Sequence, residues 1–248
     1  MGVIYVMWMR QLKKYWRSKP RMLGSLAQPI LFLVALGFGF GPIYAKAGGG
    51  NYIQFLAPGI IAMSVLFTAM FVGIEVIWDR QFGFLKETLV APVSRLKIMF
   101  GRTLGGATVA SLQGLVVLLI CLLIGFRPSS LVYLPWAFVF MFLIAFLFTA
   151  LGTAIASRLE DMQAFPLIIN FIIMPIFFLS GALFPLNGLP KSIDIITHLN
   201  PLSYGVDGLR ASFTGISQFG MVPDLLVVLA VCLVINALGS YIFSKIQV

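Results

Sequence analysis

Residues 104–125 read LGGATVASLQGLVVLLICLLIG and contain no charged side chain. An α-helix needs about 20 apolar residues to cross the hydrocarbon core of a bilayer. Inside that core the backbone N–H and C=O groups must pair within the segment, because no water is present to bond them. This stretch therefore predicts a membrane-spanning helix.

The rest of the chain contains further stretches of the same kind. The 248 residues are 60% hydrophobic and only 10% charged, whereas a soluble domain carries about 25% charged residues. We therefore expect an all-α membrane protein made of one transmembrane domain over residues 1–248, with six transmembrane helices. The five additional spans are expected at 22–41, 53–78, 131–156, 164–184 and 222–243.

The basic residues predict how these spans are oriented. Most of them flank one side of the membrane: Arg10, Lys13, Lys14, Arg17, Lys19 and Arg21 before the first span, and Arg80, Lys86, Arg95, Lys97 and Arg102 between the second and third. Lys and Arg are enriched in cytoplasmic loops, so we expect both termini in the cytoplasm and the protein in the plasma or inner membrane. The net charge of +9 then reflects topology, and no nucleic-acid partner is expected.

The N-terminal segment 1–21 shows a helical pattern of its own. Aromatic and apolar residues recur every three or four positions, with basic residues between them. This pattern is typical of an amphipathic helix that lies along lipid headgroups. Whether this helix is only an anchor or also contacts a cytoplasmic partner stays open. Its key residues are Tyr5, Trp8, Leu12, Trp16 and Arg17.

The cytoplasmic segment 79–103 is too apolar to be a simple linker. Residues 79–102 read DRQFGFLKETLVAPVSRLKIMFGR, which predicts a short helix over about 80–90 that is broken by Pro92. Apolar groups rimmed by charge are typical of a docking surface. A connector embedded in the headgroups is the alternative.

The outer segment 185–221 predicts two short helices that cap the bundle or re-enter the membrane. The first covers about 192–199 with Ser192 as its N-cap, and Asn200-Pro201 ends it. The second covers about 202–213, where Asp207 and Arg210 have the i,i+3 spacing of an ion pair.

Several kinds of chemistry have no matching residues in this sequence. There is no G-x-x-x-x-G-K-[ST] loop to hold nucleotide phosphates, and the single histidine, His198, does not supply the ligands of a His-based metal site. We expect no catalytic, cofactor or metal site, and we read Cys121 and Cys232 as small apolar residues inside spans. Glu75 is the one ionisable candidate within a span, and we expect it to reach water or Arg80.

Four motifs, in order along the chain, resemble the permeases of the ABC-2 type transporter family. LAPGI at 56–60 opens the second span, and residues 79–102 follow the pattern R-E-x-G-T-x-E-x-L-x-x-x-P-x-S-R, with Gln81-Phe82 and Phe84 as departures. FLSGALFPLNGLP at 178–190 and NPLSYGVDGLR at 200–210 resemble the outer signatures, and the latter is similar to the daunorubicin-resistance-like drug-efflux branch. The outer residues concerned are Asn200, Pro201, Asp207 and Arg210.

This resemblance implies that one chain forms the membrane pathway and another hydrolyses ATP. The permease would not be an enzyme by itself; a separate cytoplasmic ABC ATPase would bind ATP and Mg. A second copy, or a close paralogue, would complete the pathway. The coupling helix that docks the ATPase would use Arg80, Phe82, Gly83, Phe84, Leu85, Lys86 and Glu87.

The substrate is not predicted residue by residue. We expect export of an amphipathic drug, antibiotic or lipid-like molecule, because the spans are rich in Phe and Met and carry almost no charge. The alternatives are a polysaccharide or lipo-oligosaccharide exporter of the same family, an ion-coupled transporter, and a membrane assembly protein that transports nothing.

Overall fold

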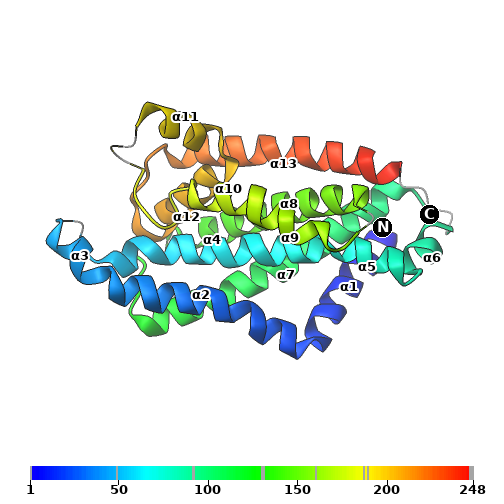
Figure 1. Cartoon of the computed structure of the whole chain (residues 1–248), viewed down its shortest axis with the longest axis horizontal. Coiled ribbons are helices and arrows are strands. Elements are labelled where there is room, and N and C mark those ends of the chain that lie inside the picture. The colour runs from blue at the N-terminus through cyan, green and yellow to red at the C-terminus, as the bar shows by residue number, and fades with distance from the viewer. Residues whose placement is uncertain are drawn as a thin grey trace.

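The computed structural model describes residues 2–48, 50–90, 93–129, 132–159, 161–186, 188 and 190–245, without the side chains of Lys86 and Leu89. Within these ranges all regular secondary structure is helical. The long helices run roughly along one axis (Figure 1). The elements are α1 (Gly2–Arg17), α2 (Lys19–Gly39), α3 (Gly41–Lys46), α4 (Tyr52–Gly73), α5 (Glu75–Gln81), α6 (Phe84–Val90), α7 (Arg95–Ile124), α8 (Leu134–Arg158), α9 (Ala164–Ile168), η1 (Ile169–Ile173), α10 (Met174–Phe178), α11 (Lys191–Leu199), α12 (Pro201–Thr214) and α13 (Met221–Ser244).

The predicted all-α membrane architecture is confirmed, although the number of long spans differs. Among the described residues, five helices are long and apolar enough to cross a bilayer: α2, α4 together with α5, α7, α8 and α13. The α4–α5 helix covers Tyr52–Gln81, with a local break at Ile74. The expected span 104–125 begins earlier, because α7 starts at Arg95 and so includes residues assigned to the cytoplasmic connection.

The remaining stretch, expected over 164–184, is shorter than predicted. The α9, η1 and α10 segments contain 5 residues each and end at Phe178. At about 1.5 Å per residue they do not cover a hydrocarbon core about 30 Å thick. Pro175 lies two residues after the end of the π-helical turn η1, and its missing N–H disturbs the normal i→i−4 ladder.

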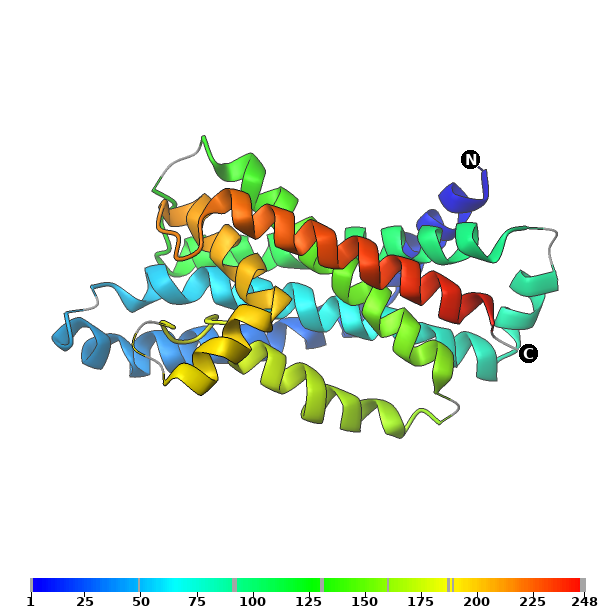
Figure 2. The same cartoon turned by 90° about the horizontal axis from the view of Figure 1, so that it is seen from above.

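The two ends of the bundle differ in what they carry. Both chain termini lie at the same end as α5 and α6, while α3, α11 and α12 lie at the other (Figure 1 and Figure 2). The first end holds the basic residues of α1 and the start of α7. We call it the basic end and the other the opposite end.

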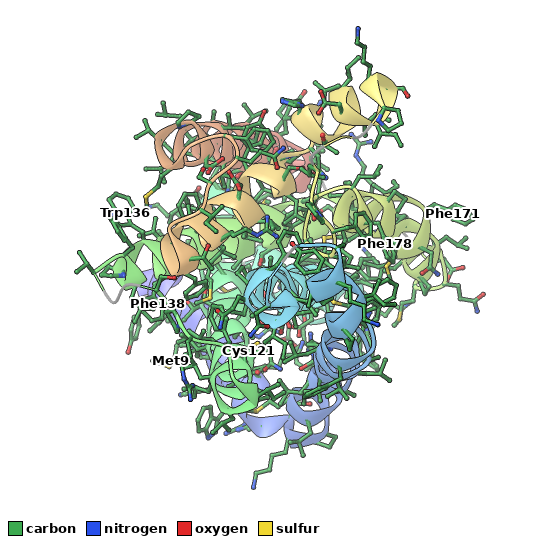
Figure 3. All side chains as sticks on the ribbon, turned by 90° about the vertical axis from the view of Figure 1, so that its left-hand side faces the viewer. Met9, Cys121, Trp136, Phe138, Phe171 and Phe178 are labelled. Atoms are coloured by element: carbon green, nitrogen blue, oxygen red, sulfur yellow. The ribbon has the colours of Figure 1, made fainter. Side chains whose placement is uncertain are left out.

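The core is built around α4. In the most apolar 18-residue stretch of the α4–α5 helix, 94% of the residues are buried. The corresponding share is 17% in α2 and in α13, which therefore lie at the periphery. Aromatic side chains such as Trp136 and Phe171 project outwards around the bundle, while Cys121 lies inside it (Figure 3). An exposed apolar belt of this kind is suited to lipid or to another membrane helix.

Helix α1 packs against α7. A Cβ at Gly101 would lie 2.9 Å from Met7 Cβ, and one at Gly105 would lie 2.8 Å from Gln11 Cβ, so these glycines allow the two helices to approach closely. The Trp8 Nε1 donates a hydrogen bond to Thr108 Oγ1 at 3.0 Å. The amphipathic helix therefore uses one face for a protein contact.

The residues predicted for the interface helix divide between two faces. Trp8 and Leu12 are partly buried on the α7 side, whereas Tyr5, Trp16 and Arg17 are exposed. Contact of these exposed side chains with headgroups stays a prediction. The helix ends at Arg17, and the rest of the expected segment 1–21 belongs to the connection and to α2.

Candidate docking site at the basic end

Two buried carboxylates organise the basic end. Glu75 and Asp79 lie one turn apart on α5 and are almost inaccessible to solvent. Asp79 Oδ2 accepts from Arg102 Nη1 at 2.5 Å, and the Arg102 side chain is only 2% exposed. The Arg10 guanidinium reaches both Asp79 oxygens, at 3.0 and 3.2 Å. Asp79 thus joins α5 to α1 and α7.

Glu75 extends the same cluster to α2. Its Oε2 lies 3.0 Å from Lys14 Nζ, and its Oε1 accepts a hydrogen bond from Arg21. The expectation that Glu75 reaches water or Arg80 is wrong, because α1 and α2 bring two other cations to it. Removing one partner of a buried ion pair leaves a costly unpaired charge. The cluster therefore fixes α5 to three other helices.

The Arg80 side chain makes a structural contact with the end of α8. Its guanidinium donates to Ser157 O at 3.0 Å and to Leu159 O at 3.1 Å, at the end of α8. The last carbonyls of a helix lack partners within the helix and attract cations. Arg80 therefore ties α5 to α8, and the helix expected over 80–90 is shorter: α6 covers Phe84–Val90.

Helix α6 follows a sharp turn at Gly83, whose φ of +78° suits glycine. Leu85 is fully buried and anchors α6 to the bundle, so its side chain is not on the surface of the single chain. Phe82 and Phe84 are 69% and 53% exposed, and Glu87 is exposed beside them. The Lys86 side chain and Pro92 lie outside the described residues.

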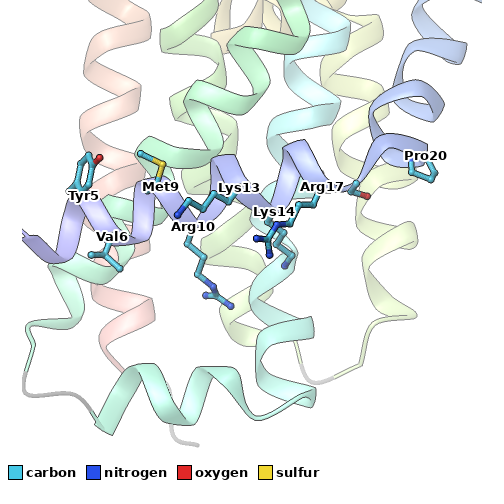
Figure 4. A pocket seen from close by; sticks show the side chains of 9 residues that line it. Tyr5, Val6, Met9, Arg10, Lys13, Lys14, Arg17 and Pro20 are labelled. Atoms are coloured by element: carbon cyan, nitrogen blue, oxygen red, sulfur yellow. The ribbon is translucent and has the colours of Figure 1, made fainter.

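A groove on α1 adds a basic and apolar surface next to α6. The groove has a volume of about 850 Å³, and Figure 4 shows Arg10 and Lys14 pointing from α1 towards the end where α5 and α6 lie. The Arg10 guanidinium carbon lies 5.9 Å from the Phe84 ring centre. We define the docking surface as Phe82, Phe84, Glu87 and this groove. The groove is lined by Tyr5, Val6, Met9, Arg10, Lys13, Lys14, Arg17, Ser18 and Pro20.

The outer motif 200–210 has a different role, because its side chains bond to backbone groups. Asn200 Oδ1 caps α12 by accepting from Leu202 N at 3.0 Å, and Asn200 Nδ2 donates to Ile176 O at 2.6 Å. Arg210 Nη2 donates to Gly181 O at 2.8 Å. These bonds satisfy carbonyls at and beyond the end of the short α9–α10 stretch, where water is scarce.

The expected Asp207–Arg210 ion pair does not form. Asp207 Oδ2 instead accepts from Ser217 Oγ at 2.9 Å and from the N–H groups of Gln218 and Phe219 at 2.7 and 2.9 Å. Arg210 packs over the Phe55 ring, with its guanidinium carbon 4.1 Å from the ring centre. Asp207 thus binds the loop before α13, and Arg210 binds the loop after α10.

The remainder of the outer segment also departs from expectation. Helix α11 begins at Lys191 with Pro190 at the N-cap position, so Ser192 is not its cap. Helix α12, with Pro201 in its first turn, has most of its residues buried and is therefore no surface cap. The segment between α10 and α11 lies directly against α4 at Gly59. A Cβ added at Gly59 would lie only 1.9 Å from Ala182 O.

Sequence reasoning missed Asp79 and Arg102 as paired residues. Glu75 and Asp79 are four positions apart at the end of a span, which places both carboxylates on one helix face. Six basic residues before the first span could have indicated partners for them. Which cation would reach which carboxylate depends on how α1 and α2 cross α5 and α7, and this is a tertiary property.

Comparison with known proteins agrees with the motifs. The family model described as ABC-2 type transporter matches residues 2–214. The putative transport permease ycf38 of Porphyra purpurea is 28% identical over 259 residues, covering 96% of this chain and 86% of that protein. Nodulation protein J of Rhizobium leguminosarum bv. trifolii is 32% identical over 197 residues, covering 78% and 74%. Nodulation protein J of Sinorhizobium fredii is 30% identical over 193 residues, covering 76% and 72%. This chain therefore belongs to the ABC-2 type transporter family and is a multi-pass membrane permease subunit.

Proposed function

We propose that this permease is the membrane subunit of an ATP-driven exporter, and that a separate ABC ATPase docks on its basic end. The observation that carries the proposal is the exposure of Phe82 and Phe84 beside a basic groove. Exposed apolar side chains rimmed by charge are typical of an interaction site. ABC-2 permeases in general work with such an ATPase.

The connection from this surface to the bundle suggests how force is transmitted. Helix α6 follows α5 through one turn, and α5 continues α4, the central helix. Closure of an ATPase dimer around ATP and Mg would displace α6 and, through it, α4. The nucleotide bound to the ATPase would thereby shift the equilibrium of the permease between its inward-open and outward-open conformations. The ATPase, not this chain, supplies the nucleotide chemistry.

The orientation and assembly follow from the same proposal. The basic end faces the cytoplasm, in keeping with the enrichment of Lys and Arg there. The protein lies in the plasma or inner membrane with both termini inside. A second copy, or a close paralogue, covers part of the exposed apolar surface of the peripheral helices α2 and α13, and lipids cover the rest.

The proposed substrate is an amphipathic drug, antibiotic or lipid-like molecule. A polysaccharide or lipo-oligosaccharide is the second candidate. Two of the relatives described above are named for nodulation and neither name refers to drug resistance, so the names of these relatives do not favour the drug branch.

The test is co-purification with an ABC ATPase encoded beside the permease gene. The double variant Phe82→Ser, Phe84→Ser removes the exposed aromatic pair. The matched control, Ile195→Ser with Ile196→Ser, removes two exposed apolar side chains from α11 at the opposite end. We expect binding to fall by about tenfold or more, as when a hot-spot residue is truncated, while the control binds normally. Equal binding by both variants would refute docking at α6.

A further inference from the structure

A cavity of about 340 Å³ lies between the first half of α2 and the second half of α4, with α1 at its base. Its size is at the lower end of the range of about 300–1,000 Å³ that is typical of small-molecule sites. It is separate from the docking surface and from the α12 motif. Its lining residues are Tyr15, Arg21, Gly24, Ser25, Gln28, Pro29, Met63, Ser64, Phe67, Thr68 and Phe71.

The two helices diverge where the cavity lies. Near the opposite end, a Cβ at Gly37 would be 3.5 Å from an Ile53 side-chain carbon, so α2 and α4 are in contact there. A Cβ at Gly24 would meet nothing within 4 Å. Pro29 lies between these positions and lacks the N–H that bonds to the preceding turn, which allows α2 to bend. The space is therefore a consequence of the path of α2.

One polar group in the wall has no partner among the described residues. Ser64 is 2% exposed, and its hydroxyl makes no hydrogen bond. Some helical hydroxyls bond to the carbonyl one turn earlier, at 2.8 Å for Thr108 and 2.6 Å for Ser157. The hydroxyls of Thr103, Ser111 and Thr149 also lack a partner, but Ser64 is the one of these four that lines the cavity. A buried hydroxyl without a partner destabilises the protein, because it has lost its hydrogen bonds to water. The lining position of Ser64 indicates that a ligand supplies the missing bond.

The base of the cavity is fixed by uncharged hydrogen bonds. The Tyr15 hydroxyl donates to Gln113 Oε1, and burial raises the pKa of Tyr15, so the phenol keeps its proton. Gln113 Nε2 in turn donates to Ser25 Oγ at 2.9 Å. This chain of bonds holds α1, α7 and α2 in place below the cavity, so the cavity has a preformed polar base.

The walls and the mouth differ in character. Met63, Phe67 and Phe71 provide an apolar wall on α4. The Arg21 side chain is 33% exposed, and we call this end of the cavity its mouth. There Arg21 is paired with Glu75, in a cluster where four cations (Arg10, Lys14, Arg21 and Arg102) face the two carboxylates Glu75 and Asp79. This excess of positive charge favours a negatively charged group at the mouth.

We infer that this cavity binds a single-chain amphiphile with a carboxylate head, which lies at the Arg21 mouth while the chain packs along Met63, Phe67 and Phe71. The Ser64 hydroxyl forms a hydrogen bond with a polar group on the chain of the amphiphile. The inference rests on the proposed function in one respect: it names the class of molecule that the exporter takes up from the inner side. Binding itself requires no ATPase.

The test uses the full chain in phosphatidylcholine nanodiscs. The photoreactive probe is a diazirine-bearing palmitic acid that carries a hydroxyl group on its chain, as a partner for Ser64. Gly24→Trp places a large side chain at a position that lines the cavity and where an added Cβ would meet nothing within 4 Å. Gly39→Trp is the matched control, because a Cβ at Gly39 on the same helix also meets nothing within 4 Å. Labelled peptides are mapped by mass spectrometry. We expect label on residues 63–71, displaced by excess palmitate and reduced about tenfold by Gly24→Trp, as expected when a chain loses its apolar contacts. Gly39→Trp should be labelled by the probe to the same extent as the wild type.

Three results would overturn the inference. Label spread over α2 and α13 without competition would show general lipid exposure only. Equal displacement by hexadecanol and by palmitate would remove the role of the carboxylate. Loss of dimers in Gly24→Trp, with no effect on labelling, would show that a second copy fills the cavity. Failure of ATPase docking with normal labelling would refute the proposed function alone, because the labelling is done without the ATPase.

Discussion

The two ends of this permease are held together by different kinds of bond. At the basic end, Glu75 and Asp79 pair with cations from three other helices. At the opposite end, Asn200 and Arg210 bond to backbone carbonyls, and Gly59 lies in direct contact with the segment at Ala182. Ion pairs between side chains dominate at the basic end, where Arg80 is the exception because it bonds to backbone carbonyls. Bonds from side chains to backbone carbonyls dominate at the opposite end.

This difference indicates which end can move. Lys14 lies 3.0 Å from Glu75 and 3.9 Å from Asp79, so its flexible side chain can exchange between the two carboxylates when α5 shifts. At the opposite end, an added Cβ at Gly59 would lie 1.9 Å from a backbone oxygen, so α4 and the segment at Ala182 have less freedom to shift than two side chains in an ion pair. We therefore expect the basic end to rearrange during the cycle while α12 keeps its contacts with α4 and α10.

The largest effect is expected for Asp79→Asn. The variant leaves Arg102 buried without a charged partner, which costs about 3–5 kcal/mol. Thermal unfolding followed by Trp fluorescence should show a strongly lowered Tm. Asp161→Asn is the control, because Asp161 is exposed and accepts only a local bond from Gln163 N. Similar Tm values for the two variants would mean that the charge cluster contributes little.

The next effect is expected at the opposite end, for Arg210→Met. The variant removes the bond to Gly181 O, and a hydrogen bond from a charged group contributes about 1.5–3 kcal/mol. Arg127→Met removes bonds to carbonyls in an exposed position, so its cost should be below about 1 kcal/mol. Limited proteolysis after the α10 segment should be faster only in Arg210→Met. Unchanged proteolysis would show that α12 is held by apolar packing alone.

The smallest effect is expected for Trp8→Phe on α1. It removes the bond from Nε1 to Thr108 at a cost of about 1 kcal/mol. Trp16→Phe is the matched control, because Trp16 is 71% exposed. Equal unfolding free energies for the two variants would mean that α1 is held by the membrane surface more than by α7.

The sequence predicted the membrane class, because length and apolarity determine spans. It also singled out Phe82 and Phe84, which are exposed, because local pattern determines amphipathic helices. Docking at these residues stays a prediction. It did not predict that Leu85 is buried or that Arg80 bonds to the end of α8. Those outcomes depend on the turn at Gly83 and on which helix ends lie nearby. Likewise, the spacing of Asp207 and Arg210 is that of a helical ion pair, but nearby unpaired backbone groups are better partners for both.

The most direct test of the account is the distance between spin labels on α6 and on the loop after α8. Val90→Cys on α6, outside the docking surface, and Asp161→Cys supply exposed labelling sites, in a background where the buried Cys121 and Cys232 are replaced by Ala. In the complex with its ATPase, Mg-ATP should shift the distance by about 5 Å, comparable to one helical turn. The permease alone should show no shift. A shift in the permease alone, or none in a complex that hydrolyses ATP, would contradict the account.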